Sequence, residues 1–463
     1  MIAQFLNRDV VLDQLEQLTE LVALDVRGSR HVSAESAALL AELRAAAVRE
    51  RARPSGQPGY DSADDRRGQA GAPLDDYSYI SRDPVISLLQ SALDEVHDRP
   101  ANAGKVVREP PPDDRRAADG DPVVTDLSLA DAPVPVHSGD RRLFEQFSVT
   151  DVQWVRVSIA EGIRLFRHKV PFNPKPAPPV QVADRVRLVL VGDWGSGIPR
   201  AQKVATEMRK SVKEARDANL SVHVVHLGDV YYSGWGYEYR KRFLPFWPVE
   251  PDEAETTGSW CLNGNHDMYS GGYAYYGVVL DEARFKPWHR GSSFFSLVNT
   301  HWKILGLDSA WEDHALMQPQ PDWLRDELKG AGRRKTMLLS HHQLFSAYEQ
   351  VDDELPAAAT PILAQHPVTS WFWGHEHRCV LYSAHQNVGF PRCLGNGGIP
   401  VYMSHNETDP YVPPATYEYR RFIQNGLERW ALFGFAVLDF HGPKIDVRYI
   451  DEDGATYKTE TIA

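Results

Sequence analysis

Cysteine is scarce in this chain, which has only Cys261, Cys379 and Cys393 among its 463 residues. An odd number of cysteines without the paired spacing of a metal knuckle argues against a disulfide framework and against a zinc finger. Cys261 and Cys379 adjoin two of the polar motifs described below. We interpret both as small buried apolar side chains rather than ligands.

Long apolar runs are also absent. No stretch approaches the roughly 18 uninterrupted apolar residues of a membrane-spanning helix, so no membrane partner is expected. The amino terminus, residues 1–9, carries acid at Asp9 and develops no apolar core followed by a small-residue cleavage site. This is not the pattern of a signal peptide. Together these absences predict a cytoplasmic protein.

Positive charge is in deficit. Lys and Arg total 50 against 63 Asp and Glu, which gives a formal net charge of -13. This balance argues against bulk electrostatic binding to nucleic acid, and no nucleic acid partner is expected. The sequence gives no indication of the oligomeric state.

The length and an ordinary hydrophobic fraction of 42% are enough for one large catalytic domain and a smaller part. Residues 1–140 differ in texture from the rest, because segments with apolar residues at helical spacing alternate with stretches rich in charge, Gly and Pro. We predict a helical appendage with disordered linkers there. The helices are expected at 5–26, 34–51 and 84–97, and the linkers at 52–76 and 109–121.

Residues 141–184 are predicted to form a helical connector, with a helix over 144–166 that ends before the proline-rich stretch 171–176. From residue 185 on, short apolar runs alternate with helical stretches such as 200–215 and 322–329. Alternating strands and helices predict a layered α/β fold whose ligands gather beyond the strand ends. The strands are expected at 185–191, 222–227, 260–262, 336–339 and 371–373, and at 433–440 and 444–450 as a pair around the turn 441–443.

A short polar block follows each of the first five strands. In isolation each block is more often a strand-to-loop turn than a site. Their order, the room for a helix between them and their carboxylate, amide, phenol and imidazole groups favour a metal centre for Fe, Mn or Zn. The blocks are Gly192-Asp193-Trp194-Gly195, Gly228-Asp229-Val230-Tyr231-Tyr232, Gly264-Asn265-His266-Asp267, Ser340-His341-His342 and Gly374-His375-Glu376-His377.

The ordered set resembles the calcineurin-like metallophosphoesterase superfamily and, within it, the purple acid phosphatases. Most of the superfamily has Asp-x-His in the first block, whereas this chain has Asp193-Trp194-Gly195. The second block supplies a phenol, Tyr232, where purple acid phosphatases place their iron-binding tyrosine. The resemblance covers roughly residues 185–463 and implies a catalytic domain there, built as an α/β/β/α sandwich with two mixed sheets.

The resemblance also implies two metal ions, Fe(III) together with Fe, Mn or Zn. Two cations neutralise the charge of a phosphate ester and lower the pKa of bound water, so the implied reaction is attack by a metal-bound hydroxide on a phosphate monoester. The implied substrate is a small phosphorylated molecule or a phosphoprotein. The implied ligands are Asp193, Tyr232 and His377 for the first ion, Asn265, His341 and His375 for the second, and Asp229 for both.

His266 directly follows the ligand position Asn265, so a turn there could direct it toward the substrate. We predict that His266 stabilises phosphate charge or protonates the leaving oxygen. Asp267 is expected to orient His266 through the other ring nitrogen.

Alternatives exist for single positions. Tyr232 could be a packing residue, because another aromatic, Tyr231, adjoins it. Adjacent residues of an extended segment point in opposite directions, so one of His341 and His342 faces the metals, and the family pattern favours His341. Hydrogen-bonded or solvated surface roles are favoured over substrate contact for His342, His289 and His314.

Two other functions compete with monoester hydrolysis. The first is a phosphodiesterase acting on cyclic nucleotides or other diesters, because the same metal platform serves both ester types. The second is a non-enzymatic scaffold controlled by the helical appendage. The complete donor set and His266 argue against the scaffold.

Overall fold

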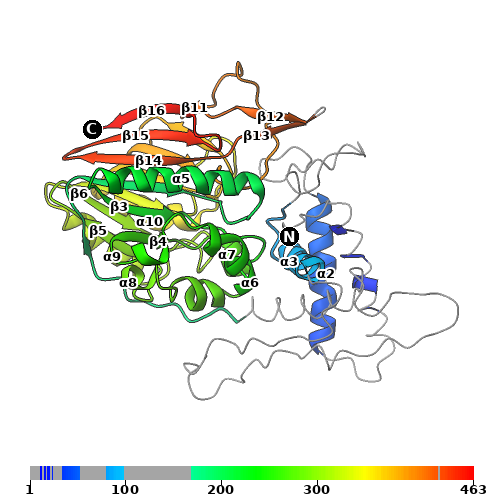
Figure 1. The fold of residues 1–463 in the computed structure, drawn as a ribbon. Coiled ribbons are helices and arrows are strands. Elements are labelled where there is room, and N and C mark those ends of the chain that lie inside the picture. Colours follow the sequence, from blue (N-terminus) through cyan, green and yellow to red (C-terminus); the bar gives the residue numbers. More distant parts are fainter. Residues whose placement is uncertain are drawn as a thin grey trace, which may run out of the picture.

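The computed structural model describes residues 11–12, 15–16, 18–20, 23, 34–52, 80–98, 168–425 and 428–463. From residue 180 on, two β-sheets pack face to face, and helices cover their outer faces (Figure 1). This is the α/β/β/α sandwich with two mixed sheets expected from the sequence.

The first sheet has six strands and carries three of the polar blocks. Strands β2, β3 and β4 are parallel, with β4 at one edge of the sheet, whereas β14 runs antiparallel to β2. The predicted turn between the last paired strands is confirmed, since His441 pairs with Lys444 and Gly442 adopts a φ of 60°. In spatial order the strands are β16 (Thr456–Ile462), β15 (Lys444–Asp451), β14 (Gly434–His441), β2 (Val186–Val191), β3 (Ser221–His226) and β4 (Thr257–Cys261).

The second sheet has eight strands and carries the other two blocks. The run β6, β7, β8 and β10 is parallel, and antiparallel strands flank it on both sides. A separate hairpin joins β12 (Phe422–Asn425) to β13 (Glu428–Ala431). In spatial order the eight strands are β1 (Val180–Gln181), β5 (Phe295–Val298), β6 (Trp302–Gly306), β7 (Lys335–Ser340), β8 (Val368–Trp373), β10 (Val388–Leu394), β9 (Cys379–Tyr382) and β11 (Ala415–Glu418).

The main core lies between the two sheets. Leu188 and Leu190 of β2 face Leu339 of β7 and Phe372 of β8 across this layer, and all four are fully buried. Because β2 is buried on both faces, its sequence reads as a nearly continuous apolar run, as parallel central strands do.

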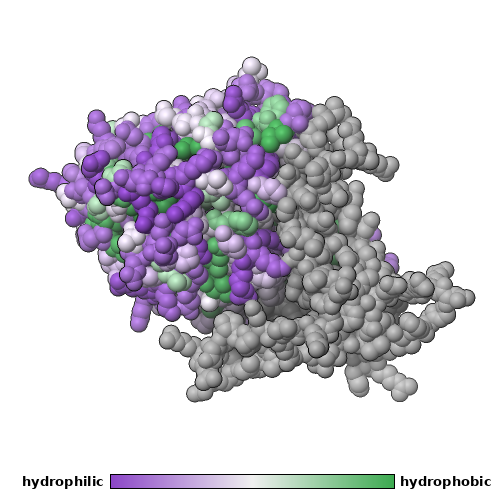
Figure 2. Space-filling model, in the orientation of Figure 1, coloured by the Kyte–Doolittle hydropathy of each residue, from purple (hydrophilic) through white to green (hydrophobic). Residues whose placement is uncertain are grey.

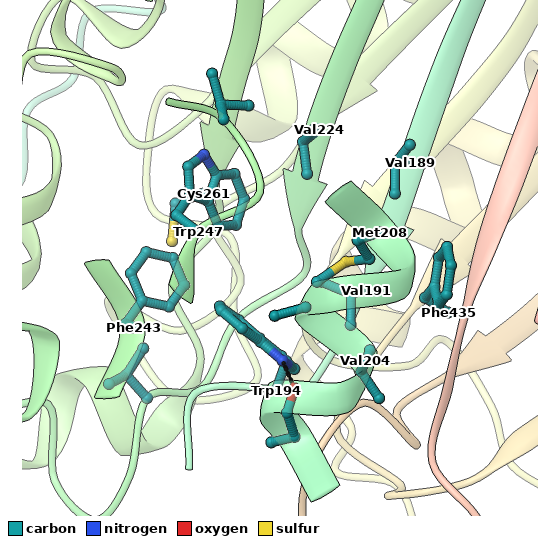
Figure 3. Packing of buried hydrophobic residues seen from close by; sticks show 14 of the residues in the cluster. Val189, Val191, Trp194, Val204, Met208, Val224, Phe243, Trp247, Cys261 and Phe435 are labelled. Carbon is teal, nitrogen blue, oxygen red and sulfur yellow. Dashed lines mark hydrogen bonds between the residues drawn. The ribbon is translucent and has the colours of Figure 1, made fainter. Parts of the chain in front are cut away.

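Helix α5 (Pro199–Asp217) covers the outer face of the first sheet (Figure 1). Pro199 occupies the first turn, where no backbone N–H is needed, and Val204, Met208 and Val212 recur at helical spacing on the buried face. Figure 3 shows Met208 beside Val191 and places Trp194 of the first polar block within this core. The indole Nε1 of Trp194 donates to the Ala201 carbonyl at 2.8 Å, so this tryptophan packs rather than binds.

Helices α9 (Gln320–Lys329) and α10 (Glu354–Gln365) cover the outer face of the second sheet through a third buried cluster. Short helical segments lie on the loops that follow the strands. They are α6 (Gly236–Glu238), α7 (Asn265–Tyr269) and α8 (Lys286–His289), with single turns at 239–243, 244–246, 251–253 and 275–279.

Two of the three helices predicted in the appendage are confirmed as α2 (Ala34–Ala52) and α3 (Pro84–Asp98). Leu43 and Ala46 of α2 pack against Ile86 and Leu89 of α3, and Trp235 of the following domain packs against the same cluster. The helix predicted at 5–26 is described only in part. The predicted linkers and the predicted helix at 144–166 lie outside the described residues, apart from Ala52 at the end of α2.

The surface in the view of Figure 2 is mainly hydrophilic over the described domain, with apolar side chains in small groups. Within the described part of the chain, each helix is too short or too polar to cross a lipid bilayer.

Candidate metal centre

The five polar blocks lie at the carboxyl ends of β2, β3, β4, β7 and β8, as the alternation of strands and helices predicts. Hydrogen bonds link the blocks at this edge, because the N–H of Gly374 donates to the carbonyl of His341 within the second sheet and the N–H of His375 donates to Oδ2 of Asp193 at the end of the first sheet. The side chains of the blocks are buried. Residues far apart in the chain therefore meet in one desolvated site.

The first group of donors consists of two carboxylates, a phenol and an imidazole. The hydroxyl of Tyr231 lies 3.0 Å from Oδ1 of Asp193, 3.1 Å from Oδ2 of Asp229 and 3.2 Å from Nε2 of His377. Nε2 of His377 also lies 3.4 Å from Oδ1 of Asp193. The donor atoms of the two aspartates and His377 all lie within 4.8 Å of one another, which is a spacing that suits a metal ion.

The phenol in this group is Tyr231 and not Tyr232, which the resemblance implied. Arg242 lies over the ring of Tyr232 at 5.0 Å, and Glu238 accepts the backbone N–H of Tyr232 at 2.6 Å. Both tyrosines are buried in the same aromatic cluster, and these two contacts fix the ring and the backbone of Tyr232 within it. The structure therefore brings the hydroxyl of Tyr231, and not that of the predicted Tyr232, to the carboxylates of this group.

The second group contains one amide and two imidazoles. Oδ1 of Asn265 lies 3.0 Å from Nε2 of His341 and 3.1 Å from Nδ1 of His375, and these two nitrogens are 3.2 Å apart. Nδ1 of His341 lies 3.0 Å from the Leu227 carbonyl, which only an N–H can satisfy, so Nε2 carries the lone pair. Nε2 of His341 lies 3.5 Å from Oδ2 of Asp229, so this carboxylate adjoins both groups.

The electrostatics of this site favour cations. Burial raises the pKa of Asp193 to about 7, and burial followed by repulsion from Asp193 and Asp267 raises the pKa of Asp229. Burial lowers the pKa values of His341 and His375, so both imidazoles are neutral. Converging lone pairs of carboxylate, amide and neutral imidazole repel one another unless a positive charge lies between them. The residues present therefore fit metal ions.

The backbone at these residues is strained. Asp193, Asp229, His375 and His377 have positive φ angles of 56°, 75°, 68° and 52°. Each non-glycine residue in this region costs about 1–3 kcal/mol, and such strain clusters at functional sites. A Cβ at Gly264 would lie only 2.0 Å from Oδ1 of Asp229, so glycine is needed for this close approach.

Asp267 does not orient His266 as expected. Nδ1 of His266 lies 2.6 Å from the Tyr232 carbonyl, which takes the orienting role. Asp267 instead accepts the backbone N–H groups of Asp229 at 2.9 Å and Gly264 at 2.7 Å. It also accepts the N–H of Val230 at 3.1 Å and the hydroxyl of Tyr239, so it clamps two of the polar blocks together.

Three further histidines are more buried than the sequence analysis expected. His342 is fully buried, and its ring lies 4.7 Å from that of His375, so both His341 and His342 approach the same histidine. The ring of His314 lies 3.8 Å from that of His342 and is tilted against it by 39°. His314, His342 and His375 also form a cluster of their own, whose nitrogens lie within 4.8 Å of one another. His289 is also buried and accepts the backbone N–H of Cys261 at 2.9 Å, so it supports β4.

Comparisons with known proteins find phosphoesterases, the class that the polar blocks resemble. The family model described as "Calcineurin-like phosphoesterase" matches residues 186–379. Tartrate-resistant acid phosphatase type 5 from Rattus norvegicus is 27% identical over 313 residues, which cover 60% of this chain and 90% of the relative. The enzyme of the same name from Homo sapiens is 27% identical over 310 residues, covering 59% and 90%.

One solved structure that is similar is described as "GAP50 the anchor in the inner membrane complex of Plasmodium". It is 14% identical, covers 60% of this chain and 88% of its own, and superposes with a TM-score of 0.45.

Proposed function

This chain is a metal-dependent phosphatase whose residues 186–379 form a calcineurin-like phosphoesterase domain, and from this premise we propose that it hydrolyses phosphate monoesters at a dinuclear metal centre. The observation that carries the proposal is the arrangement of two donor groups around one shared carboxylate. Asp229 lies 3.1 Å from the Tyr231 hydroxyl of the first group and 3.5 Å from Nε2 of His341 in the second.

The proposed ligands follow from these two groups. Six of the seven positions are those predicted from the sequence, and Tyr231 replaces Tyr232 as the phenol. A phenolate ligand suits Fe(III), and the amide and two imidazoles suit Fe, Mn or Zn. The first ion would be held by Asp193, Tyr231 and His377, the second by Asn265, His341 and His375, and both by Asp229.

When bound, the two cations supply neutralisation of the phosphate charge and a lowered pKa for water. The other residues of the site position the substrate and the groups that act on it. The Tyr232 carbonyl fixes the ring of His266 through Nδ1, and Nε2 of His266 has no hydrogen-bond partner among the described residues. Because the Tyr232 carbonyl takes the Nδ1 proton, Nε2 can donate to the phosphate oxygens or to the leaving oxygen only as the protonated imidazolium, and we propose that the dianionic substrate holds that proton there.

Asp267 has a different part in the proposal. Its carboxylate accepts the backbone N–H groups of Asp229, Val230 and Gly264. It therefore fixes the position of Asp229, the ligand shared by both ions, relative to the block 264–267. Mutation of groups that hold ligands in place in this way typically lowers metal affinity or activity about 10- to 100-fold. The catalytic assignment of Asp267 is therefore replaced by a positioning role.

The relatives named as acid phosphatases support a monoester substrate, either a small phosphorylated molecule or a phosphoprotein. The domain limits proposed from the sequence are an appendage at 1–140, a connector at 141–184 and a catalytic domain at 185–463. The fold that begins with β1 at Val180 and the family match from residue 186 support the last of these.

The test is hydrolysis of an aryl phosphate by purified protein that has been reconstituted with metal. We expect turnover that a chelator abolishes and that added metal restores. An aryl phosphodiester measured in parallel tests the monoester preference. Absence of turnover on both substrates by fully reconstituted protein would remove the proposed function, and turnover on the diester alone would replace it with a phosphodiesterase.

A further inference from the structure

Residues 80–98 lie outside the part of the chain that matches the family model, yet they contact the candidate metal centre directly. The hydroxyl of Tyr269, at the end of α7, donates to the Arg82 carbonyl at 2.6 Å. The same hydroxyl accepts a hydrogen bond from Nδ2 of Asn265 at 2.5 Å. One phenol therefore joins the appendage to a proposed metal ligand.

Helix α3, which begins two residues later, fixes this segment on the loop that follows β3. The hydroxyl of Ser91 donates to Glu238 at 2.9 Å, and Asp94 forms a buried ion pair with Arg242. Arg242 also donates to the carbonyl of Tyr231 at 2.6 Å. Figure 1 shows α3 on the side of the domain where α6 and α7 lie. Through Arg242 the helix thus holds the backbone of Tyr231, whose hydroxyl belongs to the first donor group.

The side chain of Arg82 reaches into the same site. Its Nη2 donates to the His375 carbonyl at 2.7 Å, and its Nη1 donates to Oε2 of Glu349 at 2.9 Å. Only 14% of the side chain is exposed. Its charge interacts with Asp193 and Tyr231 as well as with Glu349, and these groups keep the pKa of Arg82 above its ordinary value despite burial. A permanent positive charge therefore stands beside the first donor group.

We propose that Arg82 binds the phosphate group of the substrate, so that the helical appendage completes the active site of the catalytic domain. The inference rests on the proposed function. A phosphate monoester is dianionic, and guanidinium is the side chain best matched to phosphate oxygens because of its planar set of donors. In a buried site this charge acts with little screening by water.

Glu349 provides a second test of the proposal, because it pairs with Arg82. Its carboxylate pairs with Arg82, and its Oε1 is a buried atom with no hydrogen-bond partner among the described residues. A bound phosphate and Glu349 would compete for the same guanidinium. Removing the charge of Glu349 is therefore expected to strengthen phosphate binding, whereas removing Arg82 weakens it.

A purely structural role for Arg82 predicts a different pattern. If Arg82 only fastens the appendage to the His375 loop, its loss lowers thermal stability or metal content and leaves the affinity of intact protein for phosphate unchanged. Arg49 offers a matched control, because its Nε pairs with Asp83 at 2.6 Å and fastens the same segment away from the site.

The experiment measures the inhibition constant of inorganic phosphate and the KM and kcat for an aryl phosphate. The variants are Arg82→Met, Arg82→Lys, Glu349→Gln and Arg49→Met. Metal content and melting temperature are measured for each, and variants are compared at equal metal loading. The wild-type protein must first turn over the aryl phosphate, so that failure of the proposed function is seen separately.

We expect Arg82→Met to raise the phosphate inhibition constant about 10- to 100-fold, as loss of a charge-assisted contact does. Arg82→Lys should recover part of this, Glu349→Gln should lower the constant several-fold, and Arg49→Met should leave it unchanged. The monoester should lose more turnover than the diester in Arg82→Met. The proposal is overturned if the metal-loaded Arg82→Met protein binds phosphate as wild type does, or if Arg49→Met weakens binding equally.

Discussion

The hydroxyl of Tyr231 lies 3.0 Å from Oδ1 of Asp193, and this contact joins the ends of two adjacent parallel strands. Burial, followed by the charges of Asp193 and Asp229, raises the pKa of this phenol. A bound cation reverses that balance, because it stabilises the phenolate. The contact therefore identifies the tyrosine whose ionisation reports on the metal centre.

The two adjacent tyrosines make opposite spectroscopic predictions. Iron-loaded protein should show a visible absorption band from phenolate coordinated to Fe(III). Tyr231→Phe should abolish this band, whereas Tyr232→Phe should keep it, because Arg242 and not the donor group contacts the second ring. Absorption spectra of the two variants at equal iron content check this. A band lost only in Tyr232→Phe would restore the original sequence assignment.

Replacing Asp267 tests its positioning role. In Asp267→Asn one carboxylate oxygen becomes an amide NH2, which faces a backbone N–H of Val230 on one side or of Asp229 and Gly264 on the other. Either orientation leaves a buried donor unsatisfied, at a cost of about 1–3 kcal/mol. We expect metal affinity to fall about 10- to 100-fold. Competition with a chelator of known affinity measures this.

A catalytic role for Asp267 predicts another outcome of the same experiment. Metal affinity would then equal that of wild type, and turnover at full metal loading would still be lost. This result would contradict the positioning role.

His266 should behave in the opposite way to Asp267. His266→Ala removes a ring that is hydrogen-bonded to the Tyr232 carbonyl. The ring makes no hydrogen bond to a proposed ligand atom among the described residues. Metal content should match wild type, and kcat should fall about a hundredfold or more, as loss of a positioned acid or charge-stabilising group does. Metal analysis and steady-state kinetics on the same sample provide the check. A variant that loses its metal would move His266 into the group of structural residues.

Acid should destabilise the fold through His223, which lies far along β3 from the polar block. Burial lowers the pKa of this histidine to about 4, and the indole of Trp260 donates to its Nδ1 at 3.2 Å. Between pH 6.5 and 4 the unfolded chain binds a proton that the folded chain does not, so stability falls as the pH drops through this window. The full effect is about 3 kcal/mol, by the cost of about 1.4 kcal/mol per pKa unit.

Urea unfolding from pH 7 to pH 4 measures this slope. His223→Phe cannot take up a proton, so its stability should depend less steeply on pH in this range, even though its absolute stability is lower. Equal slopes for the variant and wild type would show that other groups cause the acid loss.

Sequence reasoning succeeded where a pattern has a local cause. The strand β2 is recognisable because burial on both faces requires a continuous apolar run, and α5 because its apolar residues recur at helical spacing. The polar blocks stand at predictable places because parallel strands all end at one edge of their sheet. For this reason the order of strands and blocks is enough to bring Asp193, Asp229 and Asn265 together.

Sequence reasoning failed where a residue's role depends on contacts with residues distant along the chain. The choice between Tyr231 and Tyr232 depends on Arg242, which lies over the ring of Tyr232, and on Glu238, which accepts the backbone N–H of Tyr232. Arg82 contacts His375 across 293 residues, and no local pattern marks it.

Asp267 was misassigned for a related reason. The partners that hold it are mainly backbone N–H groups, which every residue except proline possesses. Such donors leave no trace in the side-chain sequence, so the clamp is visible only in three dimensions.

The measurement that tests the account most directly is metal content per chain, followed together with aryl phosphate turnover as metal is added to stripped protein. The account predicts that activity reaches its plateau at two equivalents, and that Asp229→Asn, which alters the carboxylate adjoining both donor groups, loses both equivalents and the activity. A plateau at one equivalent, full activity in stripped protein, or normal metal content in Asp229→Asn would contradict it.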